Sequence, residues 1–394
     1  MKLSQRISSV PPSATIAITM RAKELQNSGV DVVSFGAGEP DFDTPQFIKD
    51  AAAAALQGGD TKYGPKSAAA LREAIAAKLQ TENNLTYQPD QVVVTVGAKH
   101  AIELLCQVLV DPGDKVLVPS PYWVSYPEMI KLAGGETVVI PASGENGFKI
   151  TPQQILDNAE GAKAIILNSP SNPTGVTYTP EELKALADAV LQTDLIVISD
   201  EIYEKLIYGD TRFTSFAALD PRLWERTITV NGLSKSFAMT GWRLGWLAGP
   251  SDVIGGVKRL MSHQTTNPVS FAQAGALAAY TDPQGAEIVE QMRQEFEKRG
   301  IHIAQRLNAI DGVECIEPTG AFYVFPNVSA HFGRTLNGVD ITGSMDLAKV
   351  ALESSKIAVV PGAPFGEDKC VRLSFATSMD QIDKGVDRLA ELLG

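Results

Sequence analysis

The sequence predicts an α/β protein, with a mostly parallel central sheet in a large domain and a smaller α+β domain after it. Between residues 90 and 250, short apolar segments alternate with helical patterns, which is typical of a sheet covered by helices. Several segments are continuously hydrophobic, as expected for strands that are buried on both faces. The length of 394 residues exceeds the roughly 250–300 residues that one hydrophobic core supports, so we expect two domains.

The elements of the large domain follow from these patterns. Alanine-rich segments at 50–57 and 66–79 predict helices, because alanine is the best helix former, and Pro180–Leu191 has a helical pattern too. The expected strands are Val92–Val96, Lys115–Val118, Thr137–Ile140, Ala164–Leu167, Leu195–Ser199, Thr227–Val230 and Leu244–Ala248.

The pattern changes near residue 283, where the smaller domain is expected to begin. A long helix is predicted from about 284 to 310, and the N-terminal 40 residues are too irregular to fold alone, so we expect them to pack against one of the two bodies. The boundaries predicted are 46–283 for the large domain, and 1–45 with 284–394 for the small one. The further strands expected in the small domain are Val313–Glu317, Phe322–Phe325, Ile357–Val360 and Val371–Phe375. Its further expected helices are Met345–Ser354 and Met379–Leu393.

Composition excludes several classes of function. The 34 basic and 46 acidic residues give a net charge of -12, which argues against nucleic acid or an anionic membrane as a partner. Three scattered cysteines and four isolated histidines offer no metal site and no Ser–His–Asp triad. The first 25 residues contain no apolar core of a signal peptide, and no apolar run approaches the ~20 residues that span a bilayer. We therefore expect a soluble cytoplasmic protein.

Reactive side chains follow the expected strands, and in an open α/β sheet ligands bind beyond the carboxyl ends of the strands. Gly97-Ala98-Lys99-His100 opens a helix after the first strand, which makes it either an anion site or an ordinary turn. The segment 168–175, NSPSNPTG, fixes a rigid turn around Asn172. A cis bond before Pro173 is expected there.

Two further strands end in chemically active groups. Asp200 ends a buried apolar strand, where a carboxylate needs a cation or donors; its alternative role is to cap a following helix. Lys235 lies among apolar residues and glycines, where its pKa can fall so that it forms a Schiff base. Arg243 supplies a permanent cation suited to phosphate. The alternative for both is a surface lysine and a salt-bridged arginine.

Together these groups fit one ligand. It has a phosphate for the glycine turn, Ser234 and Arg243, a protonatable ring nitrogen for Asp200, a phenolic oxygen for Asn172 and Tyr203, and an aldehyde for Lys235. Pyridoxal 5'-phosphate has all four features, and its binding sites require a lysine and a carboxylate at the ring nitrogen.

The chain also resembles the class I, fold-type I, pyridoxal phosphate-dependent aminotransferases, and among them the bacterial-type (Iγ/Ib) aspartate aminotransferases. The resemblance runs through nearly the whole chain. The segments that carry it are PSATIAITMRAKEL, VSFGAGEPDFDTP, TKYGPKSAAALREAI, SPYWVSYPEM, NSPSNPTG, SDEIYEKL, NGLSKSFAMTGWRLGW, PTGAFYVFP and VRLSFA.

The resemblance implies a role for each matching residue around the cofactor. Lys235 would hold the cofactor as a Schiff base and move the substrate proton. Asp200 would pair with the ring nitrogen, Asn172 and Tyr203 would bind the ring oxygen, and Trp123 would stack on the ring. Trp123 and Tyr63 would otherwise be packing aromatic residues, and Arg372 in a strand would otherwise be a salt-bridge residue.

The resemblance also implies the anion sites. The backbone of Gly97–Lys99, with Ser234 and Arg243, would hold the phosphate, and Tyr63 would reach the phosphate of the other subunit in a homodimer with shared sites. Arg372, with Asn172 and the Gly38 backbone, would bind the substrate α-carboxylate.

A second substrate carboxylate needs a further cation, for which we expect Lys99, assisted by Thr15. The alternative for Lys99 is to neutralise the phosphate only. The implied reaction is transamination between L-aspartate and 2-oxoglutarate, with ping-pong kinetics through pyridoxamine phosphate. Alternatives are a prephenate/glutamate or broad-specificity aminotransferase, another enzyme on the same cofactor such as a C–S lyase or a cyclopropane-forming synthase, or a non-catalytic binding protein.

Overall fold

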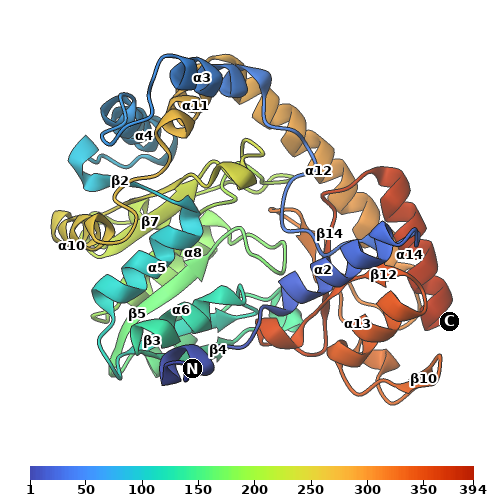
Figure 1. Ribbon diagram of the computed structural model, residues 1–394. Coiled ribbons are helices and arrows are strands. Elements are labelled where there is room, and N and C mark those ends of the chain that lie inside the picture. Colours follow the sequence, from blue (N-terminus) through green and yellow to red (C-terminus); the bar gives the residue numbers. More distant parts are fainter.

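A seven-stranded sheet forms the centre of the computed structural model, which describes residues 1–394 (Figure 1). The strand order is β2-β8-β7-β6-β5-β3-β4, and only β8 runs antiparallel to its neighbours. All seven predicted strands are therefore present, and the mostly parallel sheet is confirmed. The strands are β2 (Val92–Thr95), β3 (Lys115–Ser120), β4 (Glu136–Pro141), β5 (Ala162–Asn168), β6 (Ile196–Asp200), β7 (Thr227–Gly232) and β8 (Gly245–Ala248).

Helices cover both faces of this sheet, which explains the continuously hydrophobic strands. Val116 and Val118 of β3 point to one face, into a cluster with helices α5, α6 and α10, whereas Leu117 points to the other face, toward α7 and α8. A third group of helices, α3, α4 and α11, packs at the β2 side of the sheet. The bounds are α3 (Gln46–Gln57), α4 (Ala68–Asn83), α5 (Gly97–Leu109), α6 (Ser125–Ala133), α7 (Pro152–Asn158), α8 (Pro180–Val190), α9 (Pro221–Trp224), α10 (Ser251–Ser262) and α11 (Ser270–Thr281).

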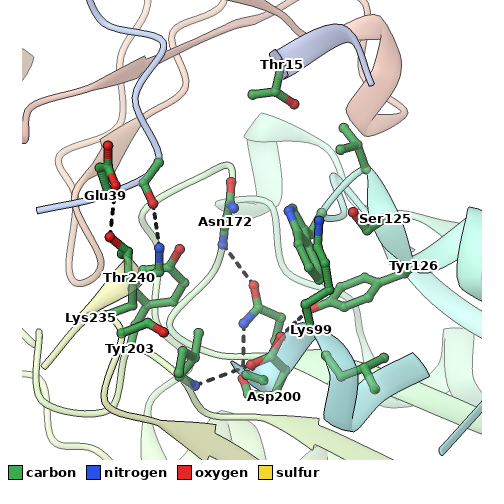
Figure 2. Close-up of a pocket in the computed structure, with 18 of the residues that line it drawn as sticks. Thr15, Glu39, Lys99, Ser125, Tyr126, Asn172, Asp200, Tyr203, Lys235 and Thr240 are labelled. Atoms are coloured by element: carbon green, nitrogen blue, oxygen red, sulfur yellow. Dashed lines mark hydrogen bonds between the residues drawn. The ribbon is translucent and has the colours of Figure 1, made fainter. Parts of the chain in front are cut away.

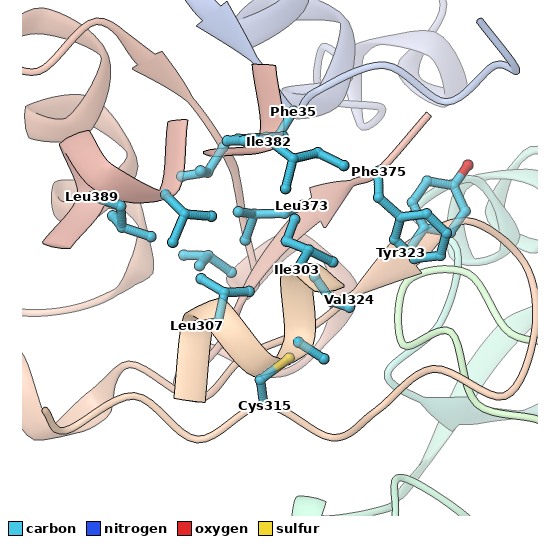
Figure 3. Packing of buried hydrophobic residues seen from close by; sticks show 14 of the residues in the cluster. Phe35, Ile303, Leu307, Cys315, Tyr323, Val324, Leu373, Phe375, Ile382 and Leu389 are labelled. Atoms are coloured by element: carbon cyan, nitrogen blue, oxygen red, sulfur yellow. The ribbon is translucent and has the colours of Figure 1, made fainter. Parts of the chain in front are cut away.

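The second body is built on a long helix and small sheets. Helix α12 (Gln284–Asn308) is about 37 Å long at 1.5 Å per residue, and it runs from beside α11 to the second body (Figure 1). A buried cluster that includes Ile303, Leu373 and Ile382 fills its centre (Figure 3). Its other elements are β9 (Tyr323–Val324), β10 (Thr335–Leu336), β11 (Val339–Asp340), α13 (Ser344–Glu353), β12 (Ile357–Ala358), β13 (Val360–Pro361), β14 (Val371–Ser374) and α14 (Met379–Leu393).

The N-terminal segment packs against this second body, as expected, although it is more regular than the sequence indicated. A short helix, α1 (Gln5–Ser8), precedes α2 (Ala14–Asn27), which contacts β12 and β13. Strand β1 (Val33–Ser34) pairs in parallel with β12. These contacts support the predicted domain boundaries, which stay a prediction because residues such as Leu206, within 46–283, also join the second body's core.

One predicted strand is wrong. Residues 313–317 form no strand and contribute only an isolated bridge between Glu314 and Asn327. None of the helices in residues 1–394 combines the length and the apolar character needed to cross a membrane.

Candidate active site

A cavity of about 390 Å³ opens between the carboxyl ends of the sheet strands and the second body. It collects side chains from segments that are far apart in the sequence, including α2, β6, the segment after β7, and β14 (Figure 2). Among the predicted site residues, those that line the cavity are Thr15, Gly38, Ala98, Lys99, Trp123, Asn172, Asp200, Tyr203, Ser234, Lys235, Arg243 and Arg372.

Lys235 follows β7 and is half-buried in this cavity. Its Nζ donates a hydrogen bond to the Gly38 carbonyl oxygen and lies 5.8 Å from the centroid of the Tyr203 ring. Burial, with a smaller effect of the nearby Arg372 cation, lowers the pKa of the Lys235 amine to about 8. A lysine with this pKa is partly unprotonated near neutral pH, as a Schiff-base lysine must be. The alternative of a surface lysine is wrong.

Asp200 is the last residue of β6 and is buried. Its carboxylate accepts a hydrogen bond from the Tyr126 hydroxyl at 2.6 Å and one from the Ile202 backbone N–H at 3.3 Å (Figure 2). Burial raises the pKa of Asp200 to about 6, against the opposing effect of the Tyr126 hydrogen bond. The residues after Asp200 form turns and no helix, so its alternative role as a helix cap is wrong. A buried carboxylate with two donors and no bonded cation is suited to hold a cationic ligand group.

Asn172 and Arg372 lie side by side in the cavity. The turn after β5 includes the expected cis bond before Pro173, and Asn172 Oδ1 accepts a hydrogen bond from Arg372 Nη1 at 3.0 Å. Arg372 Nη2 donates to the Gly36 carbonyl oxygen at 3.0 Å, and its Nε has no partner. Among the described residues no ion pair joins this buried guanidinium to a carboxylate. A buried unpaired cation is costly, so the site is built to receive an anion.

A second cluster of anion-binding groups lies at the start of α5. The helix begins at Gly97, whose φ of +80° suits glycine, and a Cβ there would lie 2.7 Å from Arg243 Nη2. A Cβ on Gly245 would lie 2.3 Å from the Ala98 nitrogen, so this glycine lets β8 pack against the first turn of the helix. The N-terminal N–H groups of α5 and the Arg243 side chain, which makes no ion pair among the described residues, together suit a phosphate.

Lys99 and Trp123 form one wall of the cavity. Lys99 Nζ lies 4.8 Å from the centroid of the Trp123 ring, and the Trp123 ring meets Tyr126 edge-on at 5.3 Å. Burial lowers the pKa of Lys99, and Arg243 lowers it further. The Lys99 ammonium therefore lies near the anion-binding groups at the start of α5 and near the space beside Trp123. Whether Lys99 binds the substrate carboxylate or only the phosphate stays a prediction.

Tyr63 is the predicted residue that the structure does not bring to the cavity. Its side chain is 87% exposed, and it belongs to the segment before α4. Gly97 is not part of the lining but directly precedes Ala98, which is. The participation of Tyr63 in a neighbouring subunit's site stays a prediction.

Sequence reasoning missed several residues of the cavity. Tyr126, the donor to Asp200, lies three positions after Trp123 in the SPYWVSYPEM segment, and its backbone N–H donates to the Trp123 carbonyl oxygen at 3.0 Å at the start of α6. Tyr323 lies in PTGAFYVFP, and nothing in its local pattern distinguishes it from a core tyrosine. Glu39 accepts a hydrogen bond from the Thr240 hydroxyl at 2.8 Å at the cavity edge.

These residues fit pyridoxal 5'-phosphate. The glycine-lined helix start with Arg243 suits the phosphate, the buried carboxylate of Asp200 suits a protonated ring nitrogen, and the Lys235 amine suits the aldehyde. Arg372 is not needed for any of these cofactor groups, so it can bind a second anion, such as the carboxylate of an amino acid.

Comparison with known proteins identifies the family. The model of the "Aminotransferase class I and II" family matches residues 30–389. An aspartate aminotransferase of Bacillus subtilis is 49% identical over 99% of this chain and 98% of its own length. A probable aspartate/prephenate aminotransferase of Aquifex aeolicus is 44% identical over 99% and 98% of the two chains. The solved aspartate aminotransferase of Thermus thermophilus with maleate is 41% identical, covers 100% of both chains, and has a TM-score of 0.92. This chain therefore belongs to the class I and II aminotransferases, with the fold-type I architecture and the pyridoxal 5'-phosphate dependence of that family.

Proposed function

We propose that this chain is an aspartate aminotransferase (EC 2.6.1.1), which transfers the amino group of L-aspartate to 2-oxoglutarate. The observation that carries the proposal is the unpaired Arg372 guanidinium in the same cavity as Lys235 and Asp200. An α-amino acid needs a cation for its carboxylate and a reactive centre for its amine. Arg372 supplies the first, and Lys235 marks the second.

We infer the cofactor contacts from the same side chains. The first turn of α5 with Ser234 and Arg243 would hold the phosphate, and Trp123 would lie against the cofactor ring. The amide nitrogen of Asn172 is available to the ring oxygen, because its Oδ1 is already bound to Arg372. Tyr203 supports the same oxygen through its hydroxyl.

The protein groups divide the proton chemistry between them. Asp200 in its ionised form keeps the proton on the ring nitrogen, and Tyr126 stabilises that ionised form. Lys235, with a pKa of about 8, takes the proton from the substrate α-carbon. It then gives the proton to the cofactor carbon that is bonded to the transferred nitrogen. When bound, pyridoxal 5'-phosphate supplies the electron sink for this proton transfer.

The second carboxylate of the substrate requires a cation in the cavity, and Lys99 can supply it. Aspartate and 2-oxoglutarate both carry a distal carboxylate, which an apolar pocket would reject. Lys99 extends from the first turn of α5 into the cavity, and Thr15 of α2 lines the opposite edge (Figure 2). We propose that the ammonium of Lys99 receives this carboxylate and that the Thr15 hydroxyl assists.

A prephenate/glutamate aminotransferase is the second candidate, because the Aquifex aeolicus relative is named for both aspartate and prephenate. A lysine is a flexible point charge and discriminates less sharply than a bidentate arginine, so one site can accept both substrates. Transamination of prephenate with glutamate or aspartate as the donor tests this candidate directly.

The active unit that we propose is a cytoplasmic homodimer. The exposed Tyr63 is the residue expected to complete the partner's site, and all three cysteines are free thiols, as is typical of a reducing compartment.

The test is a single turnover without an acceptor. Protein loaded with pyridoxal 5'-phosphate and mixed with L-aspartate should release one equivalent of oxaloacetate per subunit, and 2-oxoglutarate should make release continuous. Borohydride should fix the cofactor on the peptide that contains Lys235. Lys235→Ala should abolish both results, whereas Lys163→Ala, at an exposed ion pair with Asp114, should not. Continuous product release without any oxo acid would instead indicate a lyase.

A further inference from the structure

Tyr323 is a fully buried residue that touches both halves of the proposed site. It begins β9, where it pairs with Ser374 of β14, and Arg372 lies two positions earlier on the same strand. Residues two apart on a strand share one face, so the side chains of Tyr323 and Arg372 are diagonal neighbours. Tyr323 also lines the cavity.

Its ring and its hydroxyl contact different partners. The Arg372 guanidinium carbon lies 4.6 Å from the centroid of the Tyr323 ring, which is within the range of a cation–π contact. The Tyr323 hydroxyl lies 3.0 Å from the Tyr203 hydroxyl, and the two rings meet nearly perpendicularly at 81°. One side chain therefore joins the cation proposed for the substrate carboxylate to the phenol proposed for the cofactor.

The backbone on both sides fixes the position of Tyr323. A Cβ on Gly175, in the turn that carries Asn172, would lie only 2.0 Å from the Tyr323 carbonyl oxygen, and a Cβ on Gly38 would lie 3.4 Å from its hydroxyl. The first contact holds the backbone of Tyr323 against the turn that carries Asn172, and the side chain itself is fully buried.

Either hydroxyl can donate in the bond between Tyr323 and Tyr203. Burial raises the pKa of both phenols, and the nearby Arg372 cation opposes that rise at each of them. In the proposed site the Tyr203 hydrogen goes to the cofactor ring oxygen, so the Tyr203 oxygen accepts from the Tyr323 hydroxyl 3.0 Å away. The Tyr203 hydrogen is then free to point into the cavity, and donation through a chain of hydroxyls strengthens it.

We propose that Tyr323 is a positioning residue, whose ring holds Arg372 in place for the substrate carboxylate and whose hydroxyl orients the Tyr203 hydroxyl toward the cofactor ring oxygen. The inference rests on the proposed function and assigns a role to a residue outside the predicted site. Because the two contacts come from different parts of one side chain, two substitutions can separate them.

Tyr323→Phe keeps the ring and removes only the hydroxyl. The readout is the pH midpoint of the visible absorption band of the bound cofactor, which reports the charge shared between the ring oxygen and its neighbours. Weaker donation from Tyr203 disfavours the high-pH form, which carries more negative charge, so the midpoint should rise by about 0.3–0.7 pH units. The other ionisable groups that face Tyr203 are Tyr126, Asp200, Lys235 and Arg372, and the substitution leaves them all in place.

Tyr323→Leu removes the ring as well. Without its aromatic face, Arg372 loses a desolvated cation–π contact, and binding of maleate to the cofactor-loaded protein should weaken by about 10- to 30-fold, measured by calorimetry. Tyr323→Phe should bind maleate within about twofold of the unsubstituted protein, because the ring remains. Tyr178→Phe is the matched control, because Tyr178 is a buried tyrosine outside this cavity, and it should change neither readout.

The outcomes separate the two proposals. If the unsubstituted protein shows the pH-dependent band and transaminates, but Tyr323→Phe has the same midpoint, the positioning role is refuted and the proposed function stands. Equal maleate affinity in Tyr323→Leu and the unsubstituted protein also refutes it. If the unsubstituted protein shows neither the band nor borohydride labelling of Lys235, the proposed function fails and the inference fails with it. Should Tyr323→Leu not fold, the Tyr323→Phe titration alone decides.

Discussion

Substitution of Lys99 tests how the site selects a substrate with two carboxylates. Lys99 lies in the first turn of α5, 4.8 Å from the Trp123 ring centroid, and lines the same cavity as Arg372. Two unit charges about 4 Å apart attract by roughly 4 kcal/mol at an effective dielectric constant of 20. The Lys99 side chain is partly open to solvent, which screens the charge, so we expect Lys99→Ala to remove about 1.5–3 kcal/mol for aspartate.

The assay compares two donors. That loss corresponds to a fall of about 10- to 150-fold in kcat/KM for aspartate, whereas kcat/KM for phenylalanine, which has no distal carboxylate, should change little.

The preference for aspartate over phenylalanine should also depend on pH. Because burial and Arg243 lower the pKa of Lys99, the preference for aspartate should decline as pH rises through this lowered value, earlier than for an ordinary lysine. Lys163→Ala, at an exposed ion pair, is the matched control.

An equal loss for both donors would refute the assignment. It would mean that Lys99 serves the cofactor phosphate and not the substrate, and the dissociation constant of pyridoxal 5'-phosphate should then rise in parallel. Retained selectivity in Lys99→Ala would require a different cation for the distal carboxylate.

Three further predictions concern the cofactor, the assembly and the core. Asp200→Ala should bind cofactor but lose about 10²- to 10³-fold in kcat, while Asp200→Glu should retain far more, and equal rates for Asp200→Ala and the unsubstituted protein would exclude the role at the ring nitrogen. Mixing Tyr63→Ala and Lys235→Ala chains should restore activity through one intact site in each mixed dimer; mixed dimers without recovery would contradict shared sites. Lys78→Met should destabilise the protein by about 3–5 kcal/mol in denaturant unfolding, because it leaves buried Glu204 without its cation, and adding Glu204→Leu should recover much of that loss. No recovery in the double variant would mean that cavity formation, and not the unpaired charge, dominates.

The sequence by itself determined the central sheet and most of the site at its edge. Each strand carries its own signal; Asp200 is the last residue of β6, and Lys235 lies three residues after the end of β7. Neighbouring parallel strands end at the same edge of a sheet, so residues that follow them must lie close together. The segment Val313–Glu317 has a strand-like pattern but forms only one isolated bridge. A strand requires a neighbouring strand to pair with, and a local pattern cannot show whether one is present.

Only the tertiary structure decided the contacts that join distant segments. Lys78 and Glu204 are buried together, and Tyr323 reaches both Tyr203 and Arg372, although nothing in the local sequence marks any of these pairs. The contacts of Tyr323 depend on the register of β9 with β14 and on how the second body packs against the sheet. These are set by the shape and volume of the packed cores, which no local periodicity encodes. The sequence therefore names the chemical groups, and the packing of the two bodies decides which of them meet.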